Sequence, residues 1–317
     1  MWGKTGVLIL IIFMVLIIIP VLLVRGLFWQ KHDTELLLKV YDHRLNKIVT
    51  MELDTYLRGV LAAEMPALYH VEALKAQAVA ARSYTLKQLP RFGGPGSQKY
   101  PGADVSTDYT DCQAYLSETE MKEKWGFVAF FYNWSRINQA VEETHGQVLT
   151  YNGQVIDAVY HANSGGVTED AEYVWGRNTP YLRSIDSPHD SENERSYKNI
   201  YYFSMDKLRE KLDINHTGNI DRFSIEKRSD SGRVLEVIIA GKQYTGLEIR
   251  EKLALSSTKF EVKVENDTYT FICFGRGHGV GMSQDGANGL AKSGYNYKQI
   301  LNHYYKHVEL KRFRTPD

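Results

Sequence analysis

The stretch "GVLAAEMPALYHVEALKAQAVAARSYTL", Gly59 to Leu86, sets the fold of the first half of the chain. Its start completes a helix predicted over Thr55–Ala63, with Asp54 as the N-cap. Pro66 ends that helix, because the residue before a proline is disfavoured in the α-helical region. Apolar residues at helical spacing and many alanines then predict a second helix over Val71–Gln88.

The rest of the chain predicts hairpins and short helices. The Asn152-Gly153 pair predicts a tight hairpin turn, and "RVLEVIIAG" and "KFEVKVENDTYTFICF" are typical of strands. Helices are expected over residues 133–143, 204–212 and 246–253, and another from about Asn296. This mixture predicts an α+β fold, with helices segregated from antiparallel strands and hairpins. We expect two lobes around a cleft, the second over about residues 199–270.

Composition narrows the classes of function. The 317 residues include 38 basic and 38 acidic side chains, so no bulk charge attracts a polyanion and no nucleic-acid role is expected. Cys112 and Cys273 are too few for a disulfide framework. They could pair in an oxidising exterior, but two isolated buried thiols are the favoured interpretation.

The N-terminus is apolar enough to cross a membrane. Residues 7–24, "VLILIIFMVLIIIPVLLV", carry no charge and would form a helix of about 27 Å against a hydrocarbon core of roughly 30 Å. Lys4 and Arg25 flank this span, so charge does not set its orientation. No small-residue cleavage pattern follows it. We therefore expect a retained transmembrane helix within residues 1–30, followed by a folded domain over residues 31–317.

Glu64 is the first candidate for chemistry. It lies near the C-terminal end of the predicted helix among Ala62, Ala63 and Met65. The helix dipole and the loss of solvation there both disfavour a carboxylate, so its pKa should be raised. A carboxylic acid that stays protonated near neutrality suits general acid catalysis at a glycosidic bond. From this stretch alone, a glutamate that merely solvates the helix end is the commoner situation.

Lys75 and Arg82 are the second candidate pair. They are seven residues apart, two helical turns, so they should emerge from nearly the same face as a cationic stripe. Such a stripe could bind acidic or acetamido groups of a substrate, pair with Glu64, or face water.

Two further motifs contain a histidine. "YHANSGG" follows a predicted strand and could present His161 and Ser164 at the edge of a cleft, but its spacing is not that of a serine-hydrolase motif. In "GRGHGVGMSQ" glycines alternate around His278, with a spacing that is wrong for dinucleotide binding. These glycines should let the backbone pass close to a strand or a ligand while His278 points into it.

Taken together, four stretches resemble successive motifs of the stage II sporulation protein D family. They are "YLRGVLAAEMPALYHVEALKAQAVAARSYTL", "YHANSGGVTEDAEYVWGRNTPYLRSIDSP", "SGRVLEVIIAG" and "GRGHGVGMSQDGANGLAKSGYNYKQILNHYY". The resemblance runs from about Leu36 to the C-terminus. The family is known as membrane-anchored lytic transglycosylases of endospore-forming bacteria, which cut peptidoglycan glycan strands, especially those whose stem peptides have been removed.

The resemblance also implies roles for particular residues. Glu64 of "AAEMP" takes the place of the family's catalytic acid, and Lys75 and Arg82 take the places of two active-site contributors. The further motif positions expected to line the cleft are His161, Ser164, His278 and Gln284. The resemblance further implies partnership with stage II sporulation proteins P and M. It places the domain on the extracytoplasmic face of the engulfing mother-cell membrane, in septal wall remodelling.

One departure from the family concerns metal. Some relatives hold zinc with two His and two Cys around the segment that reads "CQAY" here. This sequence keeps only Cys112, with Tyr100, Ser106 and Asp111 at the other positions. One thiolate cannot fill a four-ligand site, so neither zinc nor any other cofactor is expected.

The implied reaction needs one carboxylate, whereas ordinary glycosidases need two. The 6-hydroxyl of N-acetylmuramic acid would serve as the nucleophile and close a 1,6-anhydro ring. An alternative comes from a different class, because domains of this family also occur in proteins described as enhancers of a cell-wall amidase. In that case the chain would be a non-catalytic glycan-binding module that enhances a partner amidase.

Overall fold

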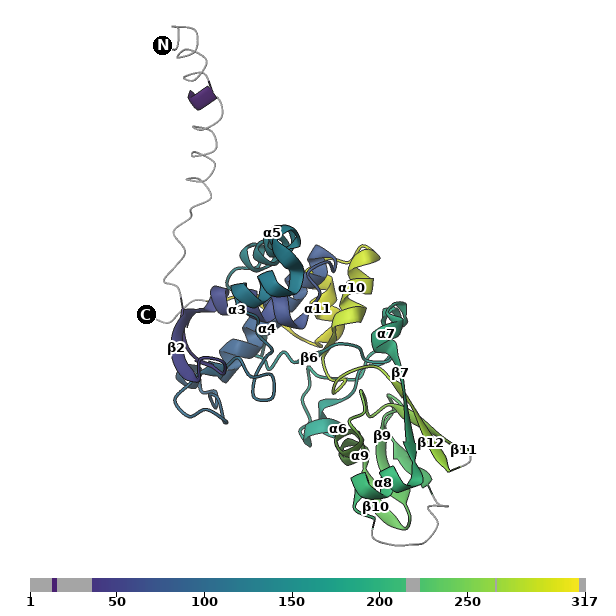
Figure 1. Cartoon of the computed structure of the whole chain (residues 1–317). Helices are drawn as coiled ribbons and strands as arrows, with labels where there is room; N and C mark the ends of the chain where they lie inside the picture. Colours follow the sequence, from purple (N-terminus) through teal and green to yellow (C-terminus); the bar gives the residue numbers. More distant parts are fainter. Residues whose placement is uncertain (1–12, 16–35, 215–222, 266, 314–317) are drawn as a thin grey trace. The chain divides into compact units, whose positions relative to one another are not determined.

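The computed structural model describes residues 13–15, 36–214, 223–265 and 267–313. Leu37–Phe313 form one compact unit (Figure 1). The predicted membrane span over residues 7–24 is described only at positions 13–15 and so lies almost wholly outside these ranges. Within the described ranges, no helix is both long and apolar enough to cross a membrane.

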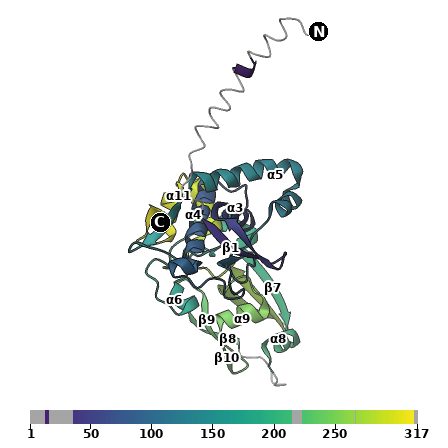
Figure 2. The same cartoon turned by 90° about the vertical axis from the view of Figure 1, so that its left-hand side faces the viewer.

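The elements up to residue 161 combine short strands with three long helices. They are β1 (Leu37–Asp42), β2 (Lys47–Glu52), α3 (Leu53–Glu64), α4 (Val71–Gln88), η2 (Pro90–Phe92), β3 (Val105–Ser106), α5 (Glu118–Glu143), β4 (Gln147–Tyr151), β5 (Gln154–Val155) and β6 (Tyr160–His161). Helices α3, α4 and α5 pack against one another, as both views show (Figures 1 and 2).

The later elements are shorter and more numerous. They are α6 (Ala171–Trp175), η3 (Pro188–Glu192), α7 (Glu194–Tyr197), β7 (Lys198–Ser204), α8 (Met205–Leu212), β8 (Phe223–Arg228), β9 (Val234–Ile239), β10 (Lys242–Thr245), α9 (Gly246–Leu253), β11 (Phe260–Glu265), β12 (Thr268–Phe274), β13 (Met282–Ser283), α10 (Gln284–Lys292), α11 (Tyr297–Tyr304) and β14 (Glu309–Arg312). The expected helices near 204–212 and 246–253, and the one after Asn296, are confirmed as α8, α9 and α11.

The strands form small sheets with the orders β2-β1-β3, β10-β9-β8, β11-β12-β7, β13-β6 and β14-β4-β5. Most pairs are antiparallel, and β1–β3 and β6–β13 are the parallel ones. The fold class is therefore α+β with antiparallel sheets, as the sequence predicts. Asn152 and Gly153 both have positive φ, 50° and 78°, which confirms the predicted hairpin turn between β4 and β5.

The first two long helices follow the sequence rules closely. Helix α3 ends at Glu64, and Met65 is extended before Pro66, with ψ of 138°. Helix α4 has the predicted bounds. The expected N-cap is wrong: α3 begins two residues early, with Glu52 at the N-cap position, because Asp54 turns its carboxylate to a buried arginine instead.

Helix α5 is much longer than the expected helix over residues 133–143. Ser117 and Glu120 form a capping box at its start, and Gly126 kinks it with φ of 73° and ψ of 162°. Between the kink and residue 133, large apolar side chains face solvent. These exposed residues break the helical period of the apolar pattern, so the pattern does not predict the first part of α5.

One hydrophobic core draws its buried residues entirely from positions 208–273, including Leu208, Val237, Phe260 and Phe271. It packs α8 and α9 against the sheets of β7–β12. This core falls inside the stretch where the sequence predicts a second lobe. The division into lobes stays a prediction.

The Gly-rich segment passes very close to other backbone. Gly275, Gly277, Gly279 and Gly281 all have positive φ. A Cβ at Gly281 would lie 2.1 Å from the carbonyl oxygen of Val159, so only glycine fits there. This close approach allows β13 to pair in parallel with β6.

Candidate active site

The carboxyl group of Glu64 lies at the C-terminal end of α3 and is half-buried. The backbone N–H of Ala114 donates a hydrogen bond of 2.7 Å to its Oε1. Burial raises the pKa of Glu64, and the Ala114 N–H and the nearby Gln284 amide lower it by less. The net direction is upward, as the sequence predicts.

A glycine in α3 makes room for the segment that carries Ala114. A Cβ at Gly59 would lie 2.0 Å from Cε2 of Tyr115, so the tyrosine ring rests directly on the helix backbone. The Leu116 N–H donates to the carbonyl oxygen of Gly59 at 3.1 Å. Gly59 therefore lets residues 114–116 lie along α3, which brings the Ala114 N–H to Glu64.

Three phenol groups lie within electrostatic range of this carboxyl. Burial raises the pKa of Tyr56, Tyr84 and Tyr160, and the charge of Glu64 raises each further. The Tyr160 hydroxyl donates to Oε1 of Gln113 at 2.7 Å. These phenols therefore stay neutral near pH 7 and can donate hydrogen bonds, but they cannot serve as bases.

A second desolvated carboxyl, Asp157, lies within electrostatic range of Tyr84. Burial raises the pKa of Asp157, and its charge, like that of Glu64, raises the pKa of Tyr84. Its Oδ1 is buried and has no hydrogen-bond partner in the described part of the chain. The sequence does not single out this residue, because an aspartate after a strand in "QVIDAV" carries no motif. Its only signal is its position next to the predicted hairpin.

Gln284 is the one expected cleft residue that the structure places beside Glu64. It is the first residue of α10, after the N-cap Ser283, whose hydroxyl accepts from the Gly286 N–H at 3.2 Å. The Gln284 Nε2 is buried and makes no hydrogen bond to any described residue. It also lowers the pKa of Glu64. An unpaired amide donor thus stands next to the candidate acid.

The two motif histidines lie together, with ring centroids 5.5 Å apart. Nδ1 of His278 accepts from the Val280 N–H at 3.1 Å, so the proton is on Nε2, which donates to the carbonyl oxygen of Tyr160 at 3.1 Å. His161 donates from Nδ1 to the Val280 carbonyl oxygen at 3.0 Å, and its Nε2 is buried without a described partner. Burial lowers both pKa values, that of His278 to about 4, so both rings are neutral.

Ser164 is fully buried and serves an internal network. Its hydroxyl and its N–H both donate to Oδ2 of Asp190, as does the Gly166 N–H at 3.1 Å. Oδ1 of Asp190 accepts from the hydroxyls of Ser187 at 3.1 Å and Ser283 at 2.5 Å. This carboxylate joins the turn after β6 to η3 and to the start of α10.

Lys75 and Arg82, expected to form a cationic stripe, pair with groups other than Glu64. Lys75 pairs with Glu72 at 2.8 Å and with Glu143 at 2.5 Å. Arg82 is 1% exposed. It donates to the Thr144 carbonyl oxygen at 2.8 Å and, at 3.3 Å each, to the carbonyl oxygens of Val141 and Gln147 and to Oδ1 of Asp54. Both cations hold the C-terminal end of α5, and a direct role of either at a substrate stays a prediction.

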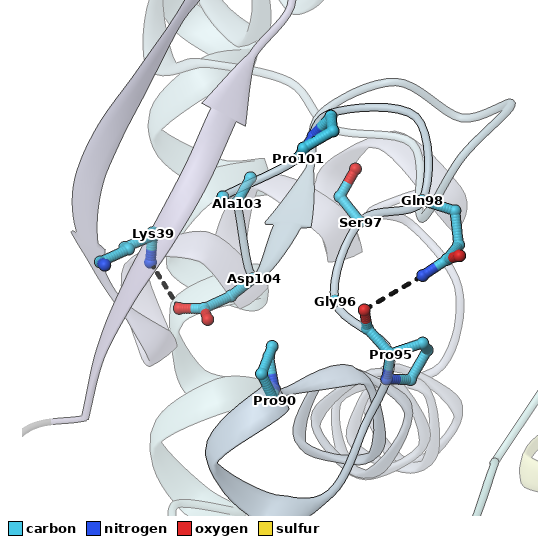
Figure 3. Close-up of a pocket in the computed structure, with 10 residues that line it drawn as sticks. Lys39, Pro90, Pro95, Gly96, Ser97, Gln98, Pro101, Ala103 and Asp104 are labelled. Carbon is cyan, nitrogen blue, oxygen red and sulfur yellow. Dashed lines mark hydrogen bonds between the residues drawn. The ribbon is translucent and has the colours of Figure 1, made fainter.

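A pocket of about 490 Å³ lies beside residues 93–102, a segment rich in glycine and proline (Figure 3). Asp104 there accepts a hydrogen bond of 2.7 Å from the backbone N–H of Lys39. The lining residues are Lys39, Pro90, Pro95, Gly96, Ser97, Gln98, Pro101, Gly102, Ala103 and Asp104. None of the residues around Glu64 lines this pocket.

The residues at the zinc positions of some relatives bond to other groups. Tyr100 donates to Oδ2 of Asp108 at 2.8 Å, and Ser106 donates to Oδ2 of Asp111 at 2.7 Å. Burial raises the pKa of the Cys112 thiol to about 11, so it stays protonated near pH 7. Over the described ranges, no three or more His, Cys, Asp or Glu side chains gather as a metal site would require. Cys112 and Cys273 are both free, and Cys273 is fully buried.

The fold and the site define an α+β protein whose candidate acid is the desolvated carboxyl of Glu64. A family model described as "Stage II sporulation protein" matches residues 41–151, which contain this carboxyl. The chain is 36% identical over 271 residues to stage II sporulation protein D of Bacillus subtilis (strain 168), covering 86% of this chain and 78% of that protein. The protein belongs to the stage II sporulation protein D family, and its relatives indicate a role in sporulation.

Other similarities extend over most of the chain. The corresponding protein of Bacillus amyloliquefaciens is also 36% identical, over 86% of this chain and 77% of that protein. A Bacillus subtilis protein named "Amidase enhancer" is 29% identical, over 78% of this chain and 39% of that protein. A model described as a domain of unknown function matches residues 187–281.

Proposed function

We propose that the protein is a membrane-anchored peptidoglycan lytic transglycosylase that uses Glu64 as its acid. It cleaves the bond between N-acetylmuramic acid and N-acetylglucosamine and leaves 1,6-anhydro ends. The observation that carries the proposal is the desolvated Glu64 carboxyl, whose pKa is raised and whose Oε1 already accepts the Ala114 N–H at 2.7 Å.

In the first step the protonated Glu64 gives its proton to the glycosidic oxygen, and the bond from that oxygen to C1 of N-acetylmuramic acid breaks. Because Oε1 is occupied by the Ala114 N–H, Oε2 is the oxygen assigned to proton transfer. The resulting carboxylate is stabilised by Ala114 and by the Gln284 amide. These donors reduce the cost of forming a charge in a desolvated site.

In the second step the carboxylate takes the proton of the 6-hydroxyl on the same sugar. The hydroxyl oxygen bonds to C1 and closes the 1,6-anhydro ring, so Glu64 ends as it began. Since this nucleophile is tethered to the reacting carbon, its effective concentration exceeds that of a free water molecule. No second carboxylate is required to activate water, and Asp157 is left for orienting Tyr84 and the substrate.

The biological setting is part of the same proposal. The substrate would be glycan strands whose stem peptides have been removed, in the septal wall remodelled during engulfment. The chain would be held by its apolar residues 7–24 in the engulfing mother-cell membrane, with the folded unit on the extracytoplasmic side. Stage II sporulation proteins P and M would be its partners there. Membership of a sporulation family supports this setting.

The test is Glu64→Gln, which keeps the size of the side chain and removes its transferable proton. Purified chain is incubated with stripped glycan, and the reducing ends are weighed by mass spectrometry. We expect wild-type protein to release ends lighter by one water than hydrolytic ends, and the variant to lose at least about 10³-fold in rate, within the range for loss of an essential proton-transfer group. Anhydro release at the wild-type rate by the variant would exclude Glu64 as the acid.

A second candidate function is a glycan-binding module that enhances a partner amidase. The similarity to a protein named "Amidase enhancer" favours it. In that case wild-type protein binds stripped glycan without creating new chain ends, and Glu64→Gln leaves binding unchanged. The same mass measurement separates the two functions.

A further inference from the structure

Helix α5 carries an exposed apolar surface that the proposed reaction does not use. Phe127, Val128, Phe131 and Tyr132 are 73%, 85%, 56% and 59% exposed. We call these four residues the α5 apolar face. They are spaced i, i+1, i+4 and i+5, so they form one patch on one side of the helix. Monomeric proteins rarely leave such a group of large apolar side chains in water without a function.

The other side of the same helix is fully used by packing. Phe130, Ile137, Ala140 and Val141 are buried there, and Phe130 forms a small core with Ala62 and Met121. The α5 apolar face therefore cannot turn inward without emptying that core. Any partner that covers this face must therefore come from outside the described unit.

The kink in α5 separates a charged first segment from the apolar one. Gly126 has φ of 73°, which side chains other than glycine rarely adopt, and a Cβ there would meet nothing within 4 Å. Lys122, Glu123 and Lys124 are exposed immediately before the kink. The apolar residues follow directly after it, so charged and apolar groups are divided as at a membrane interface.

The chain that precedes the described unit favours a lipid bilayer as the partner. The uncharged residues 7–24 can span a bilayer, and only residues 25–36 separate them from the start of β1. Twelve residues reach at most about 40 Å when fully extended. A compact domain of this length has a radius of gyration of roughly 19 Å. The tether therefore holds the folded unit next to the same bilayer surface.

We propose that the α5 apolar face docks on the surface of the lipid bilayer that holds the N-terminal span. Phe127, Val128 and Phe131 enter the region between headgroups and acyl chains, and the Tyr132 hydroxyl stays at the headgroup level. Docking fixes the height and orientation of the folded unit above the membrane. This inference rests on the membrane anchor of the proposed function, but not on the chemistry at Glu64.

The test uses the full chain in vesicles of phosphatidylethanolamine and phosphatidylglycerol. Val128→Trp places an indole at the most exposed position of the patch, and its emission is compared in vesicles with and without brominated acyl chains. The matched control is Tyr202→Trp, because Tyr202 is 69% exposed on β7, outside the patch. Flotation with the vesicles, measured in the same samples, tests the anchor separately.

We expect brominated lipid to reduce the added emission of Val128→Trp at least twofold and to leave that of Tyr202→Trp unchanged. Adding Phe127→Ser and Phe131→Ser to Val128→Trp should abolish the quenching, with the melting temperature unchanged. Because apolar insertion dominates, 0.5 M salt should have little effect.

Equal emission in both lipids, from protein that floats with the vesicles, would overturn the docking and leave the anchor standing. Absence of quenching, together with sedimentation that shows the full chain self-associating through the patch, would overturn the docking. A second copy of the chain would then cover the patch. Failure of the full chain to float would overturn the anchor and this docking together. None of these outcomes bears on whether Glu64 cleaves glycan.

Discussion

At the scale of single residues, Glu64 links stability to pH. Burial makes its neutral form the favoured one in the folded state, so its pKa there lies above the ordinary value. Stability gained from the neutral carboxyl is fully present below the unfolded pKa, and it is lost as pH rises through the folded pKa. The same change in pKa keeps the acid protonated for catalysis at higher pH than an exposed glutamate would be.

Glu64→Gln should therefore become more stable relative to wild type as pH rises from 4 to 8. The difference between the two free energies of unfolding should grow with pH over this range, because the folded state binds the Glu64 proton more tightly than the unfolded state. Denaturant titrations measure that divergence, with the exposed Glu172→Gln as control. A constant difference at all pH values would contradict the raised pKa.

Arg82 is a second residue whose role its contacts define. Burial lowers its pKa and the Asp54 carboxylate opposes that change, so a charge is held inside by one carboxylate and three carbonyl oxygens. Arg82→Ala should lower the free energy of unfolding by roughly 3 kcal/mol, because it removes a buried charged donor from three carbonyl oxygens and from Asp54. The exposed Arg195→Ala should change it by less than about 0.5 kcal/mol.

The kinetics of Arg82→Ala separate structure from substrate contact. If Arg82 acts through the fold, protein that remains folded at low temperature keeps its rate of anhydro release per folded molecule. A rate that collapses with the melting temperature unchanged would instead support the direct role that the family resemblance implies.

At the scale of elements, the contact between α3 and residues 114–116 positions the site. Gly59→Ala places a methyl group 2.0 Å from the Tyr115 ring, so the ring and the Ala114 N–H must move. We expect a loss of about 1–3 kcal/mol in the free energy of unfolding, as for other overpacked sites, together with a slower anhydro release.

A double-mutant cycle with Tyr115→Leu checks the cause of this effect. Removing the ring should restore most of the stability lost by Gly59→Ala, because the clash is with ring atoms. If the two losses simply add, the close approach of Tyr115 is not what requires glycine.

Elements with local signals could be predicted from the sequence. The end of α3 before Pro66, the bounds of α4 and the Asn152-Gly153 turn all depend on neighbouring residues. The first half of α5 could not be predicted, because its apolar residues lie on the solvent side and do not follow the buried face of a helix. The N-cap of α3 also differs, because Asp54 contacts a residue 28 positions away.

At the scale of the whole molecule, two groups whose pKa values move in opposite directions bound the pH range of stability. Burial lowers the pKa of His278 to about 4, so its neutral form is favoured in the folded state. The stability from that neutral ring is present above the unfolded pKa near 6.5, and it is lost as pH falls through about 4. Glu64 acts in the opposite direction, because its contribution to stability falls as pH rises.

The contribution of His278 to the free energy of unfolding should therefore fall as pH drops from about 6.5 toward 4. His278→Asn keeps an acceptor for the Val280 N–H and removes the titrating ring. The variant should reduce the slope of the free energy of unfolding against pH in this range by up to about 1.4 kcal/mol per pH unit, which corresponds to one proton. Urea titrations at several pH values measure the slope, and an unchanged slope in the variant would contradict the lowered pKa of His278.

The amino-acid sequence by itself determined the family, the end of α3, the bounds of α4 and the hairpin turn, and it made Glu64 the candidate acid. The helix ends and the turn depend on residues close together in the chain. Only the tertiary structure decided which residues meet that acid. Ala114 and Gln284 lie beside Glu64, Arg82 is held inside by carbonyl oxygens, and Asp157 lies within electrostatic range of Tyr84. Such neighbours follow from packing between distant segments, where burial and unpaired polar atoms set the chemistry.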